Sequence, residues 1–152
     1  MTLEKIKSLL PYQTPFLFVD ELYQVDEDGI IGSYTFSETA DFYKGHFKNN
    51  PVTPGVILTE TMAQIGLVAY GIYLLSLTNK TDDLTNAQVA LTSTEMDFFK
   101  PVYPNEKVEV VSKKIYFRFN KLKCKVEMFN NKKELVCRGT IAGMLGKNEN
   151  DS

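Results

Sequence analysis

Hydrophobic residues recur with two different periods along this chain, and each period predicts a type of element. Over residues 115–119 and 122–128 every second position is apolar, which is the period of a strand with one buried face. Together with the turn signals between them, such patterns predict six strands, over residues 16–27, 30–37, 87–98, 107–119, 122–129 and 134–145.

A long helix is predicted between the second and third strands. Thr53 is a suitable N-cap and Pro54 is favoured at a first helical position, so the helix should begin at Pro54 and run to about Thr78. Its segment 65–75 contains no charged or amide side chain, but these 11 residues are too few to span a membrane, which takes roughly 20. We therefore expect a core helix, followed by a polar loop over 79–86.

Capping and turn residues predict the remaining elements. Thr2 can cap a short helix that extends to about Leu10 and is stopped by Pro11. The dipeptide Asp28-Gly29 indicates a hairpin turn, because Gly tolerates a positive φ. Residues 39–51 have the composition of a loop.

The order of these elements predicts an α+β fold. Strands grouped on both sides of one helix favour an antiparallel sheet that wraps around it. Such a sheet also explains why the helix is apolar on nearly all faces. We expect a single domain over residues 1–145 and a mobile tail over 146–152.

Composition narrows the class of protein. The chain has 152 residues, of which 43% are hydrophobic, as in one globular domain. Its net charge of −2 argues against a general nucleic-acid binder. Cys124 and Cys137 are too few for a disulfide scaffold and are expected to be reduced thiols. Because the N-terminus lacks the long apolar core of a signal peptide, we expect a cytoplasmic protein.

The charge is unevenly distributed along the chain. Residues 1–99 hold five Lys or Arg and thirteen Asp or Glu, whereas residues 100–138 hold eleven and four. The basic segment is either a solvated strand face or a docking surface for an acidic partner protein, and the pattern alone leaves both interpretations open.

Candidate chemistry is concentrated just before and within the start of the long helix. His46, the only histidine, lies in the predicted loop and is either an incidental histidine or a base near neutral pH. Glu60 lies on the helix; a buried carboxyl there would keep its proton and act as an acid, whereas an exposed one would only interact with the helix dipole. Gln64 lies one turn further on and can hydrogen-bond the carboxylate.

Gly55 completes this set. Its amide lies in the first helical turn, where N–H groups lack intrahelical partners, so it can bind a carbonyl oxygen. A base, an acid and such an amide within 15 residues suit proton abstraction next to a carbonyl, followed by loss of a hydroxyl. The sequence has no second His and no Cys cluster near His46, and no Walker loop, dinucleotide fingerprint or GxSxG elbow, so we expect neither a metal nor a cofactor.

Three runs of the sequence carry a resemblance to a known family. The most specific is Gly45-His46-Phe47-x-x-Asn50-Pro51-Val52-x-Pro54-Gly55-Val56, followed by Glu60-x-Met62-Ala63-Gln64. The flanking runs are Leu10-Pro11-x-x-x-Pro15-Phe16-Leu17-x-Val19-Asp20 and Phe98-x-Lys100-Pro101-Val102-x-Pro104. Over about residues 3–145 the chain resembles the FabZ-type (3R)-hydroxyacyl-[acyl-carrier-protein] dehydratases.

This resemblance implies a hot-dog fold and a dimer whose two sheets join, often assembled as a trimer of dimers. It implies a site in a hydrophobic tunnel at the dimer interface, with His46 of one subunit as the base and Glu60 of the other as the acid. The Gly55 amide would bind the thioester carbonyl. The Val52 carbonyl would hold the second ring nitrogen of His46, and Gln64 would orient Glu60.

The resemblance also bears on the substrate. Leu58, Met62 and Ile65 are the expected tunnel lining, and the substrate would be carried by an acidic acyl carrier protein. Glu rather than Asp at position 60 favours dehydration without isomerisation. Two alternatives stay open: a hot-dog thioesterase, and a non-catalytic partner subunit in a dehydratase heterodimer.

The sequence departs from the family pattern at three places. The family's HFPGNP is His46-Phe47-Lys48-Asn49-Asn50-Pro51 here, its LPHR is Leu10-Pro11-Tyr12-Gln13, and its PGD is Pro104-Asn105-Glu106. We expect a less rigid loop after His46 and a divergent member of the family, in fatty-acid synthesis or in a specialised pathway such as that of a polyene pigment.

Overall fold

A computed structural model describes residues 1–78 and 87–147, together with the side chains of all of these except 87 and 147. The predicted polar loop over 79–86 and residues 148–152 of the predicted tail lie outside this part of the chain. Residues 146 and 147 belong to the last strand, which therefore extends beyond the predicted domain end at 145.

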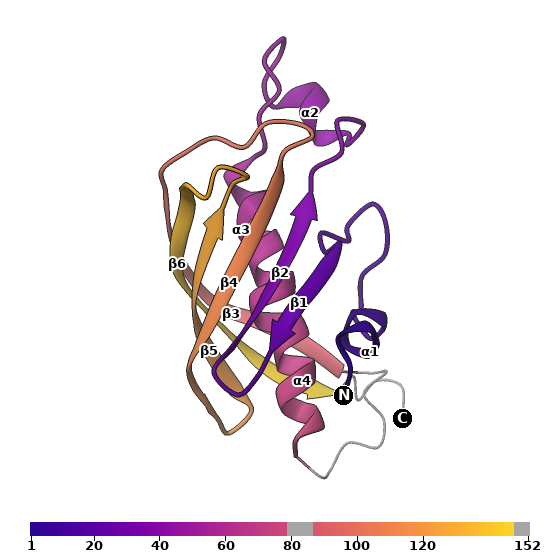
Figure 1. Cartoon of the computed structure of the whole chain (residues 1–152), viewed down its shortest axis with the longest axis vertical. Helices are drawn as coiled ribbons and strands as arrows, with labels where there is room; N and C mark the ends of the chain where they lie inside the picture. The colour runs from indigo at the N-terminus through magenta and orange to yellow at the C-terminus, as the bar shows by residue number, and fades with distance from the viewer. Residues whose placement is uncertain (79–86, 148–152) are drawn as a thin grey trace.

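The described residues form one antiparallel sheet and one long helix (Figure 1), as predicted. The strands pair in the order β1-β2-β4-β5-β6-β3. Their bounds are β1 Glu21–Val25, β2 Gly29–Thr35, β3 Ala87–Phe98, β4 Lys107–Arg118, β5 Lys121–Phe129 and β6 Leu135–Lys147. The helices are α1 Leu3–Ser8, α2 Phe42–Gly45, α3 Gly55–Ala63 and α4 Tyr70–Ser76, with a π-helical stretch η1 Gln64–Ala69 that joins the last two.

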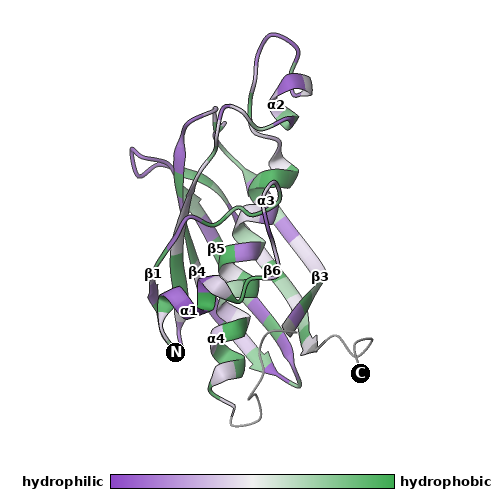
Figure 2. Ribbon diagram, turned by 90° about the vertical axis from the view of Figure 1, so that its right-hand side faces the viewer, coloured by the Kyte–Doolittle hydropathy of each residue, from purple (hydrophilic) through white to green (hydrophobic). Residues whose placement is uncertain are grey.

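The sheet curves around this continuous helix, which packs against its inner face (Figure 2). All six residues of η1 are buried. Gly66 lets the helix approach the sheet, because a Cβ there would lie 3.0 Å from side-chain atoms of Ser112 and Val126. The Ser112 hydroxyl donates to the Gly66 carbonyl oxygen at 2.9 Å. The helix Gly55–Ser76 is long and apolar enough to cross a membrane, but 72% of its most apolar window is buried inside the structure, as expected for a core helix.

The two cysteines also agree with the prediction, since both are free and buried. Burial raises the pKa of the Cys124 thiol to about 11 and that of the Cys137 thiol to about 12. Both thiols therefore stay protonated at neutral pH and serve as core side chains.

The predicted first strand is too long. Only Glu21–Val25 is a strand, because the preceding residues turn toward the helix and bond a side chain there. The Phe18 amide donates to the Gln64 Oε1 atom, and Phe16 O accepts from Gln64 Nε2. A buried polar side chain thus replaces part of the expected ladder.

The hairpin predicted at Asp28-Gly29 is present between β1 and β2, but it does not depend on a positive φ. The turn after β1 is formed by the Asp26 carboxylate, which accepts from the amides of Asp28 and Gly29. No described glycine has a positive φ; Gly29 is required because a Cβ there would lie 2.0 Å from the Ser112 carbonyl oxygen. The predicted loop over 39–51 contains the short helix α2.

The start of the long helix also differs from the prediction. Pro54 is the residue before the helix, and Thr53 makes no capping bond. The Thr53 hydroxyl instead shares a buried hydrogen bond with the Tyr43 hydroxyl. This bond joins α2 to the segment that leads into the helix, and so it positions the candidate histidine.

Candidate active site

His46 lies directly after α2 and is fixed by Val52. The His46 Nδ1 atom is 2.9 Å from the Val52 carbonyl oxygen, and the Val52 amide donates to the His46 carbonyl oxygen at 2.9 Å. Because a carbonyl oxygen only accepts, Nδ1 must carry the proton. Nε2 is then left with its lone pair, as a general base requires. The contact that the family resemblance implied between these two residues is therefore present.

Gln64 holds Glu60 through a three-bond network. The Gln64 side chain is 0% exposed. Its Nε2 atom donates to Glu60 Oε2 and to the Phe16 carbonyl oxygen, both at 2.9 Å. Its Oε1 atom accepts from the Phe18 amide at 2.7 Å. Since the amide nitrogen and oxygen each have defined partners, the side chain cannot flip, and it fixes one carboxylate oxygen of Glu60.

The electrostatic environment of Glu60 favours its protonated form. Burial raises the pKa of this carboxyl above its usual range, and the hydrogen bond from Gln64 only partly opposes the shift. A raised pKa favours the protonated form that a general acid needs.

Tyr12 is a neighbour of Glu60 that the sequence did not single out as a site residue. Burial and the nearby Glu60 charge raise the pKa of Tyr12 to about 12, so its hydroxyl stays protonated. Its ring packs near Phe16, with ring centroids 6.4 Å apart. The only sequence signal for it was its place in the motif where the family has His.

Gly55 is the first residue of α3 and lies in an open groove of about 360 Å³. A Cβ at this position would lie 3.3 Å from the Phe98 ring, so Gly leaves space beside its amide. The lining residues are Thr53, Gly55, Leu58, Phe98, Phe99, Lys100 and Pro101.

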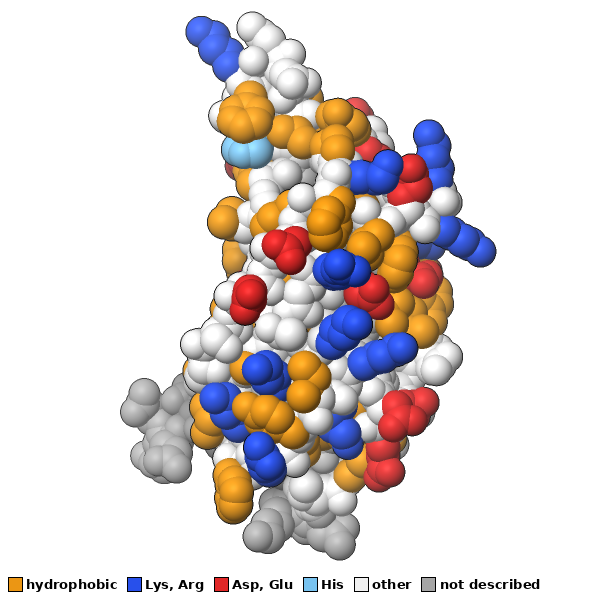
Figure 3. Space-filling view, turned by 90° about the vertical axis from the view of Figure 1, so that its left-hand side faces the viewer, with side chains coloured by type: hydrophobic (Ala, Val, Ile, Leu, Met, Phe, Trp, Pro, Cys, Tyr) orange, Lys and Arg blue, Asp and Glu red, His pale blue; other side chains and the backbone are white. Residues whose placement is uncertain are grey.

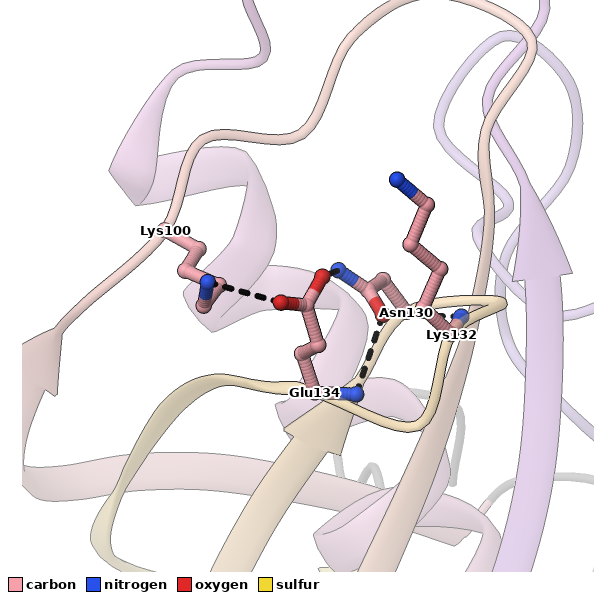
Figure 4. Close-up of polar contacts among 4 residues, drawn as sticks. All are labelled: Lys100, Asn130, Lys132 and Glu134. Carbon is pink, nitrogen blue, oxygen red and sulfur yellow. Dashed lines mark hydrogen bonds and ion pairs between the residues drawn. The ribbon is translucent and has the colours of Figure 1, made fainter.

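Lys100, which lines this groove, belongs to a polar network (Figure 4). The Lys100 ammonium lies 2.8 Å from Glu134 Oε2, and Asn130 Nδ2 donates to Glu134 Oε1 at 3.0 Å. These hydrogen bonds lower the pKa of Glu134. The network joins the turn between β5 and β6 to the segment that follows β3.

The predicted tunnel residues separate into two groups. Leu58 lines the groove, whereas Met62 and Ile65 are 0% exposed within one chain. Met62 Sδ lies 3.8 Å from the Cys137 thiol, and Ile65 packs beside Gly32. In the single chain these two side chains are core residues, and a role in lining a tunnel stays a prediction.

At two of the three departures from the family pattern, Asn with a positive φ stands where the family has Gly. Asn49 and Asn105 replace the family's glycines, and they have φ values of 63° and 70°. Asn is the residue that tolerates this left-handed region best after Gly. Asn49 can therefore adopt its positive φ at little cost, and the expectation of a less rigid loop stays a prediction.

His46 and Glu60 are held by different partners within one chain. No hydrogen bond or ion pair joins them in the described ranges, and each has its own partners, Val52 for the base and Gln64 for the acid. Glu60 and Gln64 share the side of the helix that bonds residues 16–18. A site shared between two chains, which the family resemblance implied, stays a prediction.

Comparisons with known proteins agree with this geometry. A FabA-like domain model matches residues 10–142. The FabZ 3-hydroxyacyl-[acyl-carrier-protein] dehydratase of Bartonella henselae is 33% identical over 98% of this chain and 92% of its own length. The bifunctional enzyme LpxC/FabZ of Porphyromonas gingivalis is 36% identical over 70% of this chain, which corresponds to 22% of that longer protein.

Solved structures confirm the hot-dog fold. The dehydratase heterocomplex ApeI:P from Xenorhabdus doucetiae matches with a TM-score of 0.76 at 12% identity, over 95% of this chain and 92% of the other. Thioesterase HI1161 from Haemophilus influenzae matches with a TM-score of 0.67 at 16% identity, over 97% and 92%. At these identities the structural likeness shows the fold, while the sequence matches show the family: the chain belongs to the FabA-like family and is similar over nearly its whole length to FabZ dehydratases.

Proposed function

We propose that this protein dehydrates (3R)-hydroxyacyl-[acyl-carrier-protein] thioesters to trans-2-enoyl thioesters in the cytoplasm, as a step of fatty-acid synthesis. The FabZ relatives support the activity. The observation that carries the mechanism is the pair of oriented groups, a histidine with a free Nε2 lone pair and a carboxyl whose environment favours its proton.

The reaction follows from these groups. The Gly55 amide binds the thioester carbonyl oxygen, and His46 Nε2 removes the α-proton. Negative charge develops on that oxygen, where one oriented donor stabilises it by roughly 3 kcal/mol. Glu60 then gives its proton to the β-hydroxyl, the C–O bond breaks, and water leaves as the carbon–carbon double bond forms. Glu60 in place of Asp supports dehydration without isomerisation.

A dimer through β3 would complete the site. β3 is at one edge of the sheet, and its free edge can pair with a second β3 to continue the sheet. Leu91, Phe98 and Phe99 are each about half exposed along this edge, at 49%, 48% and 52%. Burial of these apolar side chains would stabilise the pairing. In this assembly His46 of one subunit acts with Glu60 of the other. The mass of the protein in solution distinguishes a dimer from a trimer of dimers and from a complex with a different subunit.

A product assay tests the proposal. The protein is incubated with carrier-bound 3-hydroxyacyl chains of several lengths, and products are identified by mass spectrometry. Loss of one water from the acyl chain, with the thioester intact, is the expected result. Release of a free thiol and a 3-hydroxy acid would identify a thioesterase instead, and no conversion of any chain would support a non-catalytic partner subunit.

A further inference from the structure

The outer face of the β4–β5 hairpin is strongly cationic. Between residues 110 and 126 the sequence holds six Lys or Arg and no Asp or Glu. Alternate residues of β5 are 0% exposed on the inner face of the sheet, so the lysines between them lie on the outer face. Cross-strand register adds two cations of β4 to that face. This basic face consists of Lys113, Arg118, Lys121, Lys123 and Lys125.

Within the described part of the chain, these charges have no ion-pair partner. The register places Lys113 opposite Lys125 and Arg118 opposite Lys121. Like charges directly opposite one another destabilise a sheet. None of the five forms an ion pair with any residue of 1–78 or 87–147. On the neighbouring strand β6, the partners of the three lysines of β5 carry no charge; they are Thr140, Ala142 and Met144.

A nearby cation shows the contrast. Arg138 on β6 lies opposite Glu127 on one side and opposite Asp97 on the other. The charge of Arg138 therefore has a carboxylate across from it on each neighbouring strand, as is usual on a solvated sheet surface. The basic face lacks any such arrangement, although its charge repulsion lowers stability.

Apolar side chains lie among the cations. Phe119, at the tip of the hairpin, is 93% exposed and has a φ of 51°. A bulky residue disfavours this conformation, and its exposed ring contributes little to the fold. Ile115 and Met144 are 51% and 40% exposed. Figure 3 shows Lys and Arg side chains gathered with apolar ones between them on the lower part of the face that it displays.

The position of the hairpin relates it to the site of a second subunit. In Figure 1 the β4–β5 turn and the end of α4 lie at one end of the molecule, and α2 lies at the other. Two β3 edges that pair about a two-fold axis run antiparallel, so the partner's long axis is reversed. The basic face of one subunit then lies at the end where the partner's α2 and helix start are found.

We propose that this basic face docks the acidic surface of the carrier protein that delivers the acyl chain, with Phe119 as an apolar anchor. This inference rests on the proposed function, which supplies the partner. Cations around an exposed aromatic side chain suit association with an acidic protein, because the charges accelerate encounter and the ring provides buried contact area.

A charge-reversal pair tests the docking surface. The double variant Lys113→Glu/Lys125→Glu reverses the charge of two exposed cations that face each other. Lys5→Glu/Lys7→Glu, at exposed positions of α1, is the matched control. Each protein is assayed with the same 3-hydroxyacyl group on acyl carrier protein and on N-acetylcysteamine. We expect kcat/KM to fall at least about tenfold for the carrier-bound substrate only, and its salt dependence to weaken. The control should match the wild type.

Phe119→Ser should weaken carrier binding about threefold or more. Its turnover of the N-acetylcysteamine thioester should be unchanged, and this unchanged turnover also shows that the variant is folded. Binding of the carrier protein itself, measured by titration, separates this proposal from the proposed function, because docking can be present even if no substrate is dehydrated. Unchanged carrier binding in Lys113→Glu/Lys125→Glu would overturn the docking surface. A second result would also overturn it: if the wild type binds anionic phosphatidylglycerol vesicles and this variant loses that binding but keeps carrier binding, the face binds a membrane instead.

Discussion

Replacement of Gln64 by Met tests whether this side chain holds the acid and the N-terminal segment together. Met has a similar length but makes none of the three hydrogen bonds of Gln64. The largest cost comes from the Phe18 amide, because Phe18 is 3% exposed and water cannot replace the lost acceptor. An unsatisfied buried donor costs about 1–3 kcal/mol. Phe16 is 48% exposed, so its carbonyl can bind water at little cost.

The total loss should therefore be about 2–3 kcal/mol, which lowers Tm by roughly 4–12 °C in a chain of this size. The loss should be larger at pH 7 than at pH 4. The hydrogen bond from Gln64 favours the charged form of Glu60, and without it the pKa of Glu60 in the folded protein rises further. A carboxyl whose folded pKa is raised costs stability as pH increases through that pKa.

Calorimetry at equal protein concentration checks the stability, and the pH dependence of kcat/KM checks the acid. The upper limb of that profile should move to higher pH in Gln64→Met, because Glu60 keeps its proton longer. Gln24→Met, at an exposed position of β1, is the control for the exchange of side chains. If Gln64→Met melts within a degree of the wild type and has the same pH profile, then the network does not hold Glu60.

Three further predictions address the site. Gly55→Ala should lower kcat/KM about tenfold or more with little change in Tm, because the added Cβ would press on the Phe98 ring at 3.3 Å beside the carbonyl-binding amide; activity equal to the wild type would show that the substrate does not need the space beside that amide. Asn49→Gly should keep activity and stability, whereas Asn49→Val should cost about 1–2 kcal/mol of stability, since its φ is 63°; equal stability of the two variants by urea denaturation would refute the backbone explanation. The kcat/KM of the wild type should fall at high pH with an apparent pKa above the usual carboxyl range, because Glu60 must carry its proton; a profile with no fall, or with a fall within the usual carboxyl range, would refute Glu60 as the acid.

The sequence predicted most of the fold because its signals are periodic. Alternation located the inner face of β5 and the apolar run located the buried helix, and both are set by burial alone. The errors occur where a side chain replaces backbone pairing. Residues 16–18 look like a strand, but they bond Gln64, and Thr53 looks like a cap, but it bonds Tyr43. Such long-range contacts leave no local pattern.

The candidate site was predictable only in part. The pattern of His46, Gly55 and Glu60 is local in sequence and was found there. Tyr12 was not selected, because its relation to Glu60 depends on how the N-terminal segment folds over the helix. The backbone role of Asn49 and Asn105 was also hidden, since only the φ angles show that both lie in the left-handed region.

Complementation between two inactive variants tests the central claim most directly. His46→Ala removes the base and Glu60→Gln removes the acid, so each variant alone should be inactive while its fold and mass are unchanged. In a mixed dimer, one of the two shared sites receives His46 from one chain and Glu60 from the other, and the second site has neither. With free exchange of subunits, about half of the dimers are mixed, so an equal mixture should recover about a quarter of wild-type activity. Full subunit exchange, shown by mass spectrometry, with no recovery of activity would contradict a site shared between two chains.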